Sequence, residues 1–341
     1  MTAYQHGGDI HSFAQKAGCN PEEVIDLSSN INFVKPHINV DFNRLDISAY
    51  PNYDTLYEAV ALRYGVALDE MELFGGGSAA IFALFGYFKG RHLGLPLRCT
   101  IYTPAYLEYK KAATLFGYEV VQINRFESMD RVPPKGSLVI FVNPATPDGM
   151  VYELPALLEI WEKQECTVLV DESFIEFSNA PSMTSLLHTY PNLYILKSMT
   201  KYYGAAGIRI GTLISQASNI TTLRTTEPLW KLSAFDTAYL CVALSDSTFP
   251  EHSAVENAKS KVHLIETLQH APQIEKIYPG HANYVLVKLK HITADALQEI
   301  LLPHRIMIRD CGNFDGLDAY HARIAVKALP AMQTLREALD V

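Results

Sequence analysis

The sequence has 341 residues, of which 48% are hydrophobic and 19% charged, and its formal net charge is -9. This length suits two domains with a sizeable core. The excess of carboxylates argues against nucleic-acid binding, so any anionic ligand must be held by a few placed cations. The longest strongly apolar run, residues 79–88, is about half of what a membrane helix needs. The N-terminal residues lack the basic and apolar parts of a signal peptide.

The cysteines are odd in number and scattered, and none has the spacing of a zinc site. We therefore expect reduced thiols, no metal site and a cytoplasmic protein. The cysteines are Cys19, Cys99, Cys166, Cys241 and Cys311.

After about forty irregular residues, short β-rich runs alternate with amphipathic helical stretches such as Ala105–Phe116 and Leu154–Gln164. Continuous apolar strands separated by helices are typical of a mostly parallel sheet that is covered on both faces, an α/β fold. The predicted strands are Cys99–Tyr102, Glu119–Ile123, Ser137–Val142, Thr167–Val170, Leu193–Leu196 and Ile208–Ile214.

A long helical pattern from about Glu251 to His270 breaks this rhythm. It is followed by strand Tyr284–Leu289, helix Ala294–Leu302, strand His321–Val326 and a final helix, which indicates a smaller α+β domain. We expect an N-terminal arm of residues 1–42 that joins the small domain, a large domain of residues 43–240, and a small domain of residues 241–341. Ligands of parallel α/β sheets bind beyond the carboxyl ends of the strands, so the loops there are the candidate site.

The first unusual loop is the run Gly75-Gly76-Gly77-Ser78, which opens a helical stretch. Glycines let the backbone approach an anion, and a helix N-terminus offers unpaired N–H groups. A plain glycine turn before a helix explains the same residues.

The second loop begins with Asp171 at the end of an apolar run. A carboxylate at a buried strand end is costly unless it is paired, and a protonated pyridine nitrogen would be such a partner. A helix or loop cap is the alternative interpretation.

The third loop contains Ser198 and Lys201 and is followed by Arg209. A lysine between a strand and a glycine-rich turn is placed to be partly desolvated, which lowers its pKa and suits it to Schiff-base chemistry. Arg209 can bind a phosphate alongside Ser198. The alternative is a surface lysine in a loop.

The fourth loop contains Arg309, and Arg323 lies within a neighbouring apolar strand. An arginine in such a strand rarely stays unpaired. Binding of an anionic ligand and structural ion pairing both remain open.

Together these residues resemble the fold-type I enzymes that depend on pyridoxal 5'-phosphate (PLP), over nearly the whole chain. The spacing Ser198-x-x-Lys201 with Arg209 eight residues on is similar to the lysine and phosphate-binding signature of that family. The resemblance implies that Lys201 carries the cofactor and that Asp171 pairs with its pyridine nitrogen. It further implies a homodimer with shared active sites. The remaining cofactor-binding residues that it implies are Gly77, Ser78, Ala79, Tyr106, Thr146 and, from the partner subunit, Tyr50.

Within that family the chain resembles two groups, the histidinol-phosphate aminotransferases and, more strongly, the threonine-phosphate decarboxylases of cobamide biosynthesis. Three segments carry the second resemblance: the opening His6-Gly7-Gly8, residues 28–32, and residues 308–317. The substrate-binding residues that it implies are His6, Gly7, Gly8, Asn32, Arg309 and Arg323.

Two positions depart from the family pattern. Thr146 replaces the asparagine that usually bonds the 3'-oxygen of the cofactor, and Phe174 replaces a tyrosine that bonds the same oxygen. Both changes reduce the support expected around that oxygen.

The resemblance implies a PLP-dependent decarboxylase, a carbon–carbon lyase. Its substrate would be L-threonine O-3-phosphate or L-serine O-phosphate, and its product aminopropanol phosphate or ethanolamine phosphate for cobamide or norcobamide biosynthesis. One methyl group separates these substrates and is worth only about 1–3 kcal/mol in a pocket, so the sequence does not rank them. The alternatives are a histidinol-phosphate aminotransferase and a binding module without catalysis, which would be expected to lose Lys201, Asp171 or Arg209.

Overall fold

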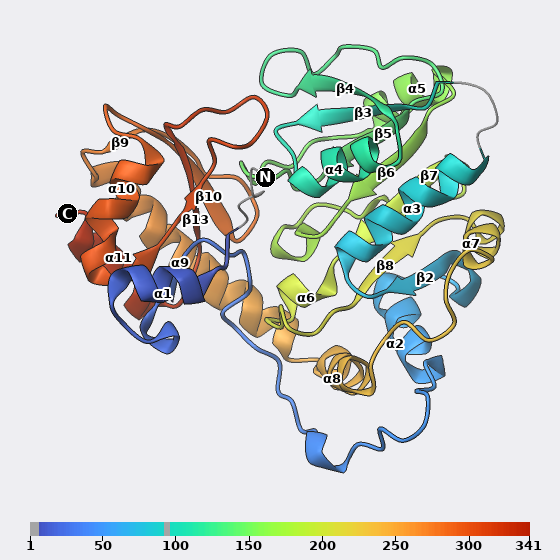
Figure 1. The fold of residues 1–341 in the computed structure, drawn as a ribbon, viewed down its shortest axis with the longest axis horizontal. Coiled ribbons are helices and arrows are strands. Elements are labelled where there is room, and N and C mark those ends of the chain that lie inside the picture. Colours follow the sequence, from blue (N-terminus) through green and yellow to red (C-terminus); the bar gives the residue numbers. More distant parts are fainter. Residues whose placement is uncertain (1–6, 92–95) are drawn as a thin grey trace.

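A computed structural model describes residues 7–91 and 96–341. The chain forms a larger and a smaller lobe (Figure 1). The larger lobe contains a seven-stranded sheet of order β2-β8-β7-β6-β5-β3-β4, in which only β8 runs antiparallel to its neighbours. Its strands are β2 (Met71–Phe74), β3 (Arg98–Thr103), β4 (Glu119–Asn124), β5 (Leu138–Val142), β6 (Thr167–Asp171), β7 (Leu193–Lys197) and β8 (Gly211–Ile214).

The smaller lobe contains an antiparallel four-stranded sheet of order β12-β13-β10-β9. A separate parallel pair, β1 with β11, attaches the N-terminal segment to this lobe. The strands are β1 (Ile25–Asp26), β9 (Ile274–Tyr278), β10 (Tyr284–Leu289), β11 (Ile306–Met307), β12 (Arg309–Asp310) and β13 (His321–Ala325).

Helices cover both faces of the large sheet, as the apolar runs predict. In β6, Val168 and Val170 face the core that includes α2, α5 and α8, whereas Leu169 faces the core that includes α3, α4 and α7. Side chains alternate between the two faces along each strand, so a continuous apolar run supplies buried apolar side chains to both faces. The helices are α1 (Ile10–Ala17), α2 (Asp54–Tyr64), α3 (Gly77–Arg91), α4 (Leu107–Leu115), α5 (Pro155–Lys163), α6 (Met199–Tyr202), α7 (Ala217–Arg224), α8 (Ala234–Ser245), α9 (Phe249–His270), α10 (Ala294–Leu301) and α11 (Leu329–Ala338).

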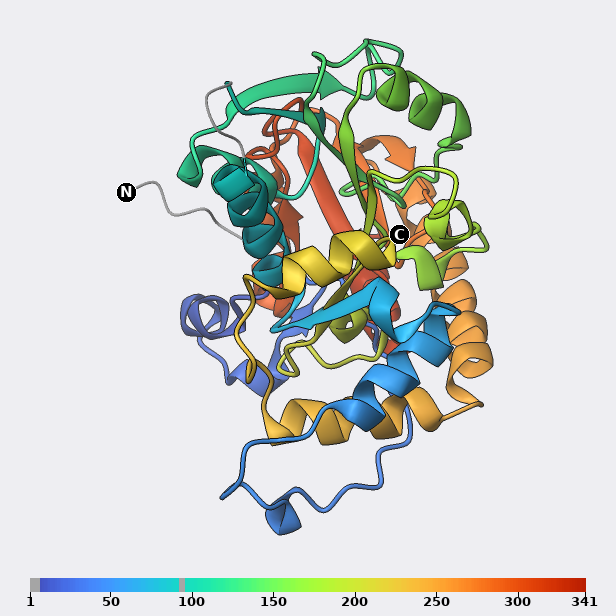
Figure 2. The same cartoon turned by 90° about the vertical axis from the view of Figure 1, so that its right-hand side faces the viewer.

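Helix α9 connects the two lobes. Phe249 at its start packs in the core of the large lobe, while Leu264 and Leu268 pack in the core of the small lobe. A domain boundary after residue 240 would cut α8, which lies beside α2 in both views (Figures 1 and 2). We therefore propose that the break falls between α8 and α9.

The elements expected from the sequence are all present, with ends shifted by a few residues. The expected strand Ile208–Ile214 begins only at Gly211, since the preceding residues form a turn. Within residues 7–91 and 96–341, no helix combines the length and apolarity that crossing a membrane requires.

Candidate active site

Two adjoining cavities, of about 460 and 210 Å³, lie beyond the carboxyl ends of the parallel strands. They share six lining residues, so they form one continuous site between the lobes: Gly7, Ser29, Ile31, Tyr106, Asp171 and Lys201. The topology of the sheet places a ligand site at this edge.

Asp171 ends β6 and is buried, with 4% of its surface exposed. One carboxylate oxygen accepts hydrogen bonds from the backbone N–H and the hydroxyl of Ser173, and the other accepts one from the Tyr109 hydroxyl at 2.6 Å. Burial, and then the charge of Asp171, raise the pKa of Tyr109 well above its usual range, so this hydroxyl stays a donor. A carboxylate has about four acceptor sites, and these three donors leave one for a cationic N–H of a ligand.

Lys201 lies in α6, which begins directly after β7 and Ser198. Its Nζ sits 4.4 Å from the ring centroid of Phe174 and 6.0 Å from that of Tyr106. Burial is the main cause that lowers its pKa; the charges of Arg323 and Arg209 lower it further, and Asp171 opposes them. An amine with a lowered pKa is more often neutral, which a nucleophile requires.

One end of the cavity gathers groups that suit a phosphate. The turn before α3 contains Gly76 at φ +95°, and a Cβ there would lie 2.7 Å from an Nη of Arg209. Only glycine lets this guanidinium lie against the turn. Ser78 and Ser198 line the same cavity, and the Ser78 hydroxyl lies 3.3 Å from that of Tyr106. Unpaired helix N–H groups, hydroxyls and a guanidinium together match a phosphate dianion.

Gly77 lines this end too, and Ala79, two residues further on, occupies the first turn of α3. The side chain of Ala79 is not part of the cavity wall, so only its backbone N–H is available for the predicted contact.

The opposite end of the cavity is lined by two buried arginines, Arg309 and Arg323, which face each other across the β12–β13 pair. Their exposed fractions are 6% and 8%, and burial is the main cause that lowers the pKa of each. Among the residues that the structure describes, neither has a carboxylate within ion-pairing distance. Buried cations without a counter-ion are costly in a medium of low dielectric constant. This end of the site therefore favours an anion.

Both arginines are held by neutral acceptors. Arg323 donates to the Thr146 hydroxyl at 3.2 Å and to the backbone carbonyl of Ser28 at 3.0 Å. Arg309 donates to the Asn313 side chain at 2.8 Å, and its guanidinium lies 5.3 Å from the ring centroid of Phe314. These contacts fix the guanidinium planes without neutralising their charge.

The N-terminal segment closes the anion end. Gly7 packs on Ser28 so closely that a Cβ on Gly7 would lie 2.5 Å from the Ser28 carbonyl oxygen, which also accepts the bond from Arg323. The N–H of Gly8 donates to the Ser28 hydroxyl at 2.8 Å. Gly7 lines both cavities and Gly8 lines the larger one, whereas His6 lies outside the described residues.

Asn32 does not line the cavity, in contrast to its predicted role in binding substrate. It is 2% exposed, and its amide donates to the Tyr202 carbonyl and the Ser253 hydroxyl, both at 2.8 Å. Its carbonyl accepts bonds from Val34 and Asn257. Asn32 is thus a structural residue that joins the N-terminal segment to α6 and α9.

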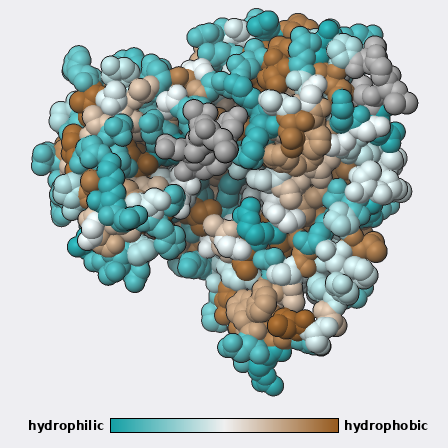
Figure 3. All heavy atoms as spheres, in the orientation of Figure 1, coloured by the Kyte–Doolittle hydropathy of each residue, from teal (hydrophilic) through white to brown (hydrophobic). Residues whose placement is uncertain are grey.

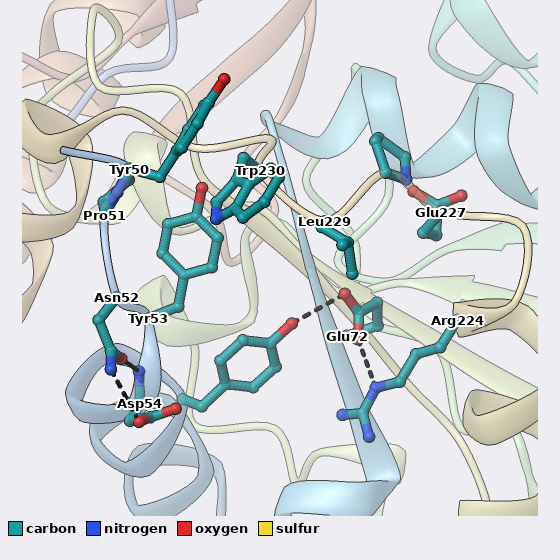
Figure 4. Close-up of a pocket in the computed structure, with 12 residues that line it drawn as sticks. Tyr50, Pro51, Asn52, Tyr53, Asp54, Glu72, Arg224, Glu227, Leu229 and Trp230 are labelled. Atoms are coloured by element: carbon teal, nitrogen blue, oxygen red, sulfur yellow. Dashed lines mark hydrogen bonds and ion pairs between the residues drawn. The ribbon is translucent and has the colours of Figure 1, made fainter.

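Tyr50 lies in a separate pocket of about 570 Å³ (Figure 4). It is 73% exposed and stacks on Trp230 at a centroid distance of 4.2 Å. Trp230 is itself 56% exposed, whereas Trp161 is fully buried. Within the single chain, the structure does not bring Tyr50 to the cavity.

Sequence reasoning missed Tyr109 and Ser173 as partners of Asp171. Tyr109 lies three residues after Tyr106, a spacing that puts both rings on one side of a helix start and could have indicated a shared role. The ring centroids of the two tyrosines are 6.2 Å apart. Ser173 had a signal too, since a serine two residues after an aspartate often donates to it in a turn.

The site residues fit PLP. The glycine turn and Arg209 suit its phosphate, the free acceptor site of Asp171 suits its protonated ring nitrogen, and Lys201 suits its aldehyde. The departures remain: the hydroxyl of Thr146 accepts a bond from Arg323, and Phe174 has no polar group to offer the 3'-oxygen.

Residues 23–341 match the family model for aminotransferases of class I and II. A threonine-phosphate decarboxylase of Salmonella typhimurium is 28% identical over 98% of this chain and 95% of its own. A histidinol-phosphate aminotransferase of Methanothermobacter thermautotrophicus is 27% identical over 98% of this chain and 93% of its own. The crystal structure of a histidinol-phosphate aminotransferase from Clostridium acetobutylicum has a TM-score of 0.80 at 27% identity, covering 93% of this chain and 98% of its own. The chain belongs to the class I and II aminotransferase family and is a PLP-dependent enzyme of that fold.

Proposed function

We propose that this enzyme removes the carboxylate of an O-phosphorylated hydroxy amino acid, L-threonine O-3-phosphate or L-serine O-phosphate. The products are aminopropanol phosphate or ethanolamine phosphate, for use in cobamide or norcobamide biosynthesis. The observation that carries the proposal is the pair of buried arginines in the same cavity as Lys201, for which residues 7–91 and 96–341 offer no carboxylate within ion-pairing distance. A substrate with both a carboxylate and a phosphate supplies the negative charge that this end lacks.

Three parts of the chain would hold the cofactor: the turn at Gly76 with Arg209, the carboxylate of Asp171, and the amine of Lys201. Bound PLP supplies an electron-withdrawing ring that stabilises the electron pair released at Cα of the substrate. The carboxyl group of Asp171, held by three donors, would face the ring nitrogen and so favour its protonated form.

The arginines decide which bond at Cα breaks. Arg309 and Arg323 anchor the two anionic groups of the substrate, and the anchoring sets its rotation about the bond from nitrogen to Cα. Positioning of this kind supplies on the order of 7–11 kcal/mol in favourable cases. The Cα–carboxylate bond breaks, carbon dioxide leaves, and the ammonium form of Lys201 donates a proton to Cα.

The segment that contains Gly7 and Gly8 contributes by covering the anion end. Its backbone lies against Ser28, whose carbonyl oxygen orients Arg323. Exclusion of water there strengthens the attraction between the arginines and the substrate anions.

A histidinol-phosphate aminotransferase is the second candidate, and the 27% identical relative and the neighbouring structure favour it. It would use the same cofactor residues. Histidinol phosphate carries no carboxylate on Cα. Its reaction requires the Cα hydrogen to face the lysine, and it requires a keto acid as the second substrate.

A product assay separates the candidates. The purified enzyme with PLP is incubated with phosphothreonine, with phosphoserine, and with histidinol phosphate plus 2-oxoglutarate. We expect carbon dioxide and an amino-alcohol phosphate from the first or second incubation, without turnover of keto acid. Glutamate from the third incubation alone would support the aminotransferase.

We further propose a homodimer in which Tyr50 of a second copy reaches the phosphate end of the site. Hydrophobic side chains gather just above the hydrophilic lower tip of the molecule, around α8 (Figure 3). Exposed apolar side chains on and near this end favour burial against a partner. They are Ile47, Tyr50, Leu229, Trp230 and Phe235.

A further inference from the structure

We propose that Lys110 and Gln122 are positioning residues for the substrate. By binding Asp315, they fix the loop of residues 311–318 whose other side chains orient Arg309. The inference rests on the proposed function, because it assigns to Arg309 the grip on a substrate anion.

The loop begins directly after β12 and supports Arg309 at its near end. Asn313 accepts a hydrogen bond from the Arg309 guanidinium, and the Phe314 ring lies 5.3 Å from it. Phe314 is only 5% exposed and lines the substrate cavity. The conformation of this loop therefore determines where the guanidinium points.

The far end of the loop is attached to the large lobe. Both carboxylate oxygens of Asp315 accept hydrogen bonds from Nζ of Lys110, at 2.8 and 3.0 Å, and one also accepts from the Gln122 amide at 2.7 Å. Gly316, at φ +88°, lies against the side chain of Asn124 at the end of β4. These contacts anchor the loop to two different elements of the large sheet and its helices.

The anchoring connects the two ends of the active site. Lys110 lies on α4, one residue after Tyr109, which bonds Asp171 at the cofactor end. Through Asp315 and Phe314, the same helix reaches Arg309 at the anion end. The ion pair is partly exposed, with side-chain exposures of 43% and 31%. It therefore contributes little to global stability, and variants that lack it are expected to fold.

The test uses two substitutions in the PLP-loaded enzyme that each remove one charge, Lys110→Met a positive one and Asp315→Asn a negative one. If Asp315 acts only by its distant charge, K110M weakens and D315N strengthens the binding of an anionic substrate. If Asp315 anchors the loop, both substitutions weaken it. We expect each to raise KM for phosphothreonine or phosphoserine about fivefold, with kcat within about twofold and the cofactor absorbance unchanged.

Two further variants sharpen the test. Lys111→Met makes the same charge change one residue along α4, where the lysine pairs with Glu108, and is expected to leave KM within about twofold. The exchanged pair K110D/D315K restores the opposite charges and is expected to recover most of the loss seen in D315K.

Calorimetric binding of inorganic phosphate to the PLP-loaded enzyme is measured in parallel, and K110M and D315N are expected to weaken it too. If neither amino acid is decarboxylated, the proposed function fails, but the phosphate binding still tests the anchoring. The anchoring is overturned if K110M and D315N change binding in opposite directions, if neither changes it, or if K111M matches K110M.

Discussion

The two ends of the active-site cavity differ in how far the protein itself compensates their buried charges. At the cofactor end, the carboxylate of Asp171 already accepts three hydrogen bonds from protein donors. At the substrate end, Arg309 and Arg323 are buried among neutral acceptors, and no carboxylate of the described residues lies within ion-pairing distance. At the cofactor end, hydrogen bonds thus hold the carboxylate in place before a ligand binds. At the anion end, the charge of the arginines calls for an anion to balance it.

Arg125 provides a reference for a buried arginine whose charge is balanced. Its guanidinium donates to both oxygens of Asp148 at 3.1–3.2 Å, and the exposures of the two side chains are 1% and 0%. It also donates to the carbonyls of Pro104 and Thr146, which belong to two loops of the site. On the proposed function, the same residue type serves structure at Arg125 and ligand binding at the anion end, and the presence of a carboxylate partner distinguishes the two cases.

The largest effect is expected from removing the amine that lies between the two ends. Lys201→Ala is expected to lower kcat by at least about a thousandfold, since neither the bond to the cofactor nor the proton for Cα can be supplied. Turnover of phosphothreonine and phosphoserine measures the loss. Lys259→Ala, on the exposed side of α9, is the control and should keep full activity.

The comparison of Arg125 with Arg323 predicts opposite changes in stability. Arg125→Met leaves Asp148 buried and unpaired and is expected to lower the free energy of unfolding by about 3–5 kcal/mol. Arg323→Met removes a buried charge that no carboxylate of the described residues contacts directly, and it is expected to leave that free energy unchanged or to raise it by about 1–2 kcal/mol. Urea denaturation of the enzyme without substrate measures both.

Arg323→Met is nevertheless expected to raise KM for the phosphorylated substrate about a hundredfold. An equal loss of stability in the two methionine variants, or unchanged substrate binding in R323M, would remove the distinction between the two arginines.

A smaller effect is expected on the ionisation of Lys201. Burial is the main cause that lowers the pKa of this amine below its ordinary value of 10.5, and the charge of Arg323 lowers it further, so Arg323→Met should raise it. The rate at which the PLP-free enzyme captures PLP rises as the amine loses its proton, and its midpoint pH should therefore move upwards in the variant. Arg98→Met, at an exposed ion pair with Glu119, should not move it. A midpoint that stays fixed or falls in R323M contradicts the assigned influence of Arg323.

The lowered pKa also has a consequence for stability, with a definite sign. Between the pKa of Lys201 in the folded chain and 10.5, the unfolded chain binds more protons at this amine. The contribution of this group to stability therefore rises with pH across that window.

The smallest effect concerns Tyr50, whose predicted role needs a second copy of the chain. Tyr50→Phe keeps the stacking on Trp230 and removes only the hydroxyl, so PLP affinity is expected to fall about threefold to tenfold. Equilibrium dialysis measures it, and sedimentation shows whether the variant still assembles as the parent does. Unchanged affinity would contradict the hydroxyl contact, while a monomeric parent enzyme would contradict the shared site.

Much of this site follows from the sequence because its parts are local. The strand that ends at Asp171 and the turn that follows Ser198 are set by continuous apolar runs and by neighbouring glycines. Parallel pairing of β6 with β7 then brings the two segments together. The sequence also predicts roles for Lys201 and Arg209, because covalent chemistry and phosphate binding need particular residue types.

The rest depends on contacts between segments far apart in the chain, which a single sequence does not encode visibly. The family resemblance implied that Asn32 binds substrate, but its side-chain amide donates to partners 170 and 221 residues away. The pairing of Arg125 with Asp148 and the contact of Thr146 with Arg323 were hidden for the same reason. The sequence therefore left open which arginines have a carboxylate partner. This difference distinguishes the structural arginine from those proposed to bind a ligand.

Borohydride reduction of the PLP-loaded enzyme, followed by peptide mass mapping, tests the central claim most directly. The account predicts that reduction fixes the cofactor on the peptide that contains Lys201, and that the Lys201→Ala variant carries none. Lys197, four residues earlier, is the informative comparison, because its amine is buried in an ion pair with Glu172 and should stay unmodified. Cofactor mass on Lys197 or on another lysine, or no fixed cofactor at all, would contradict the assignment of this cavity as the active site.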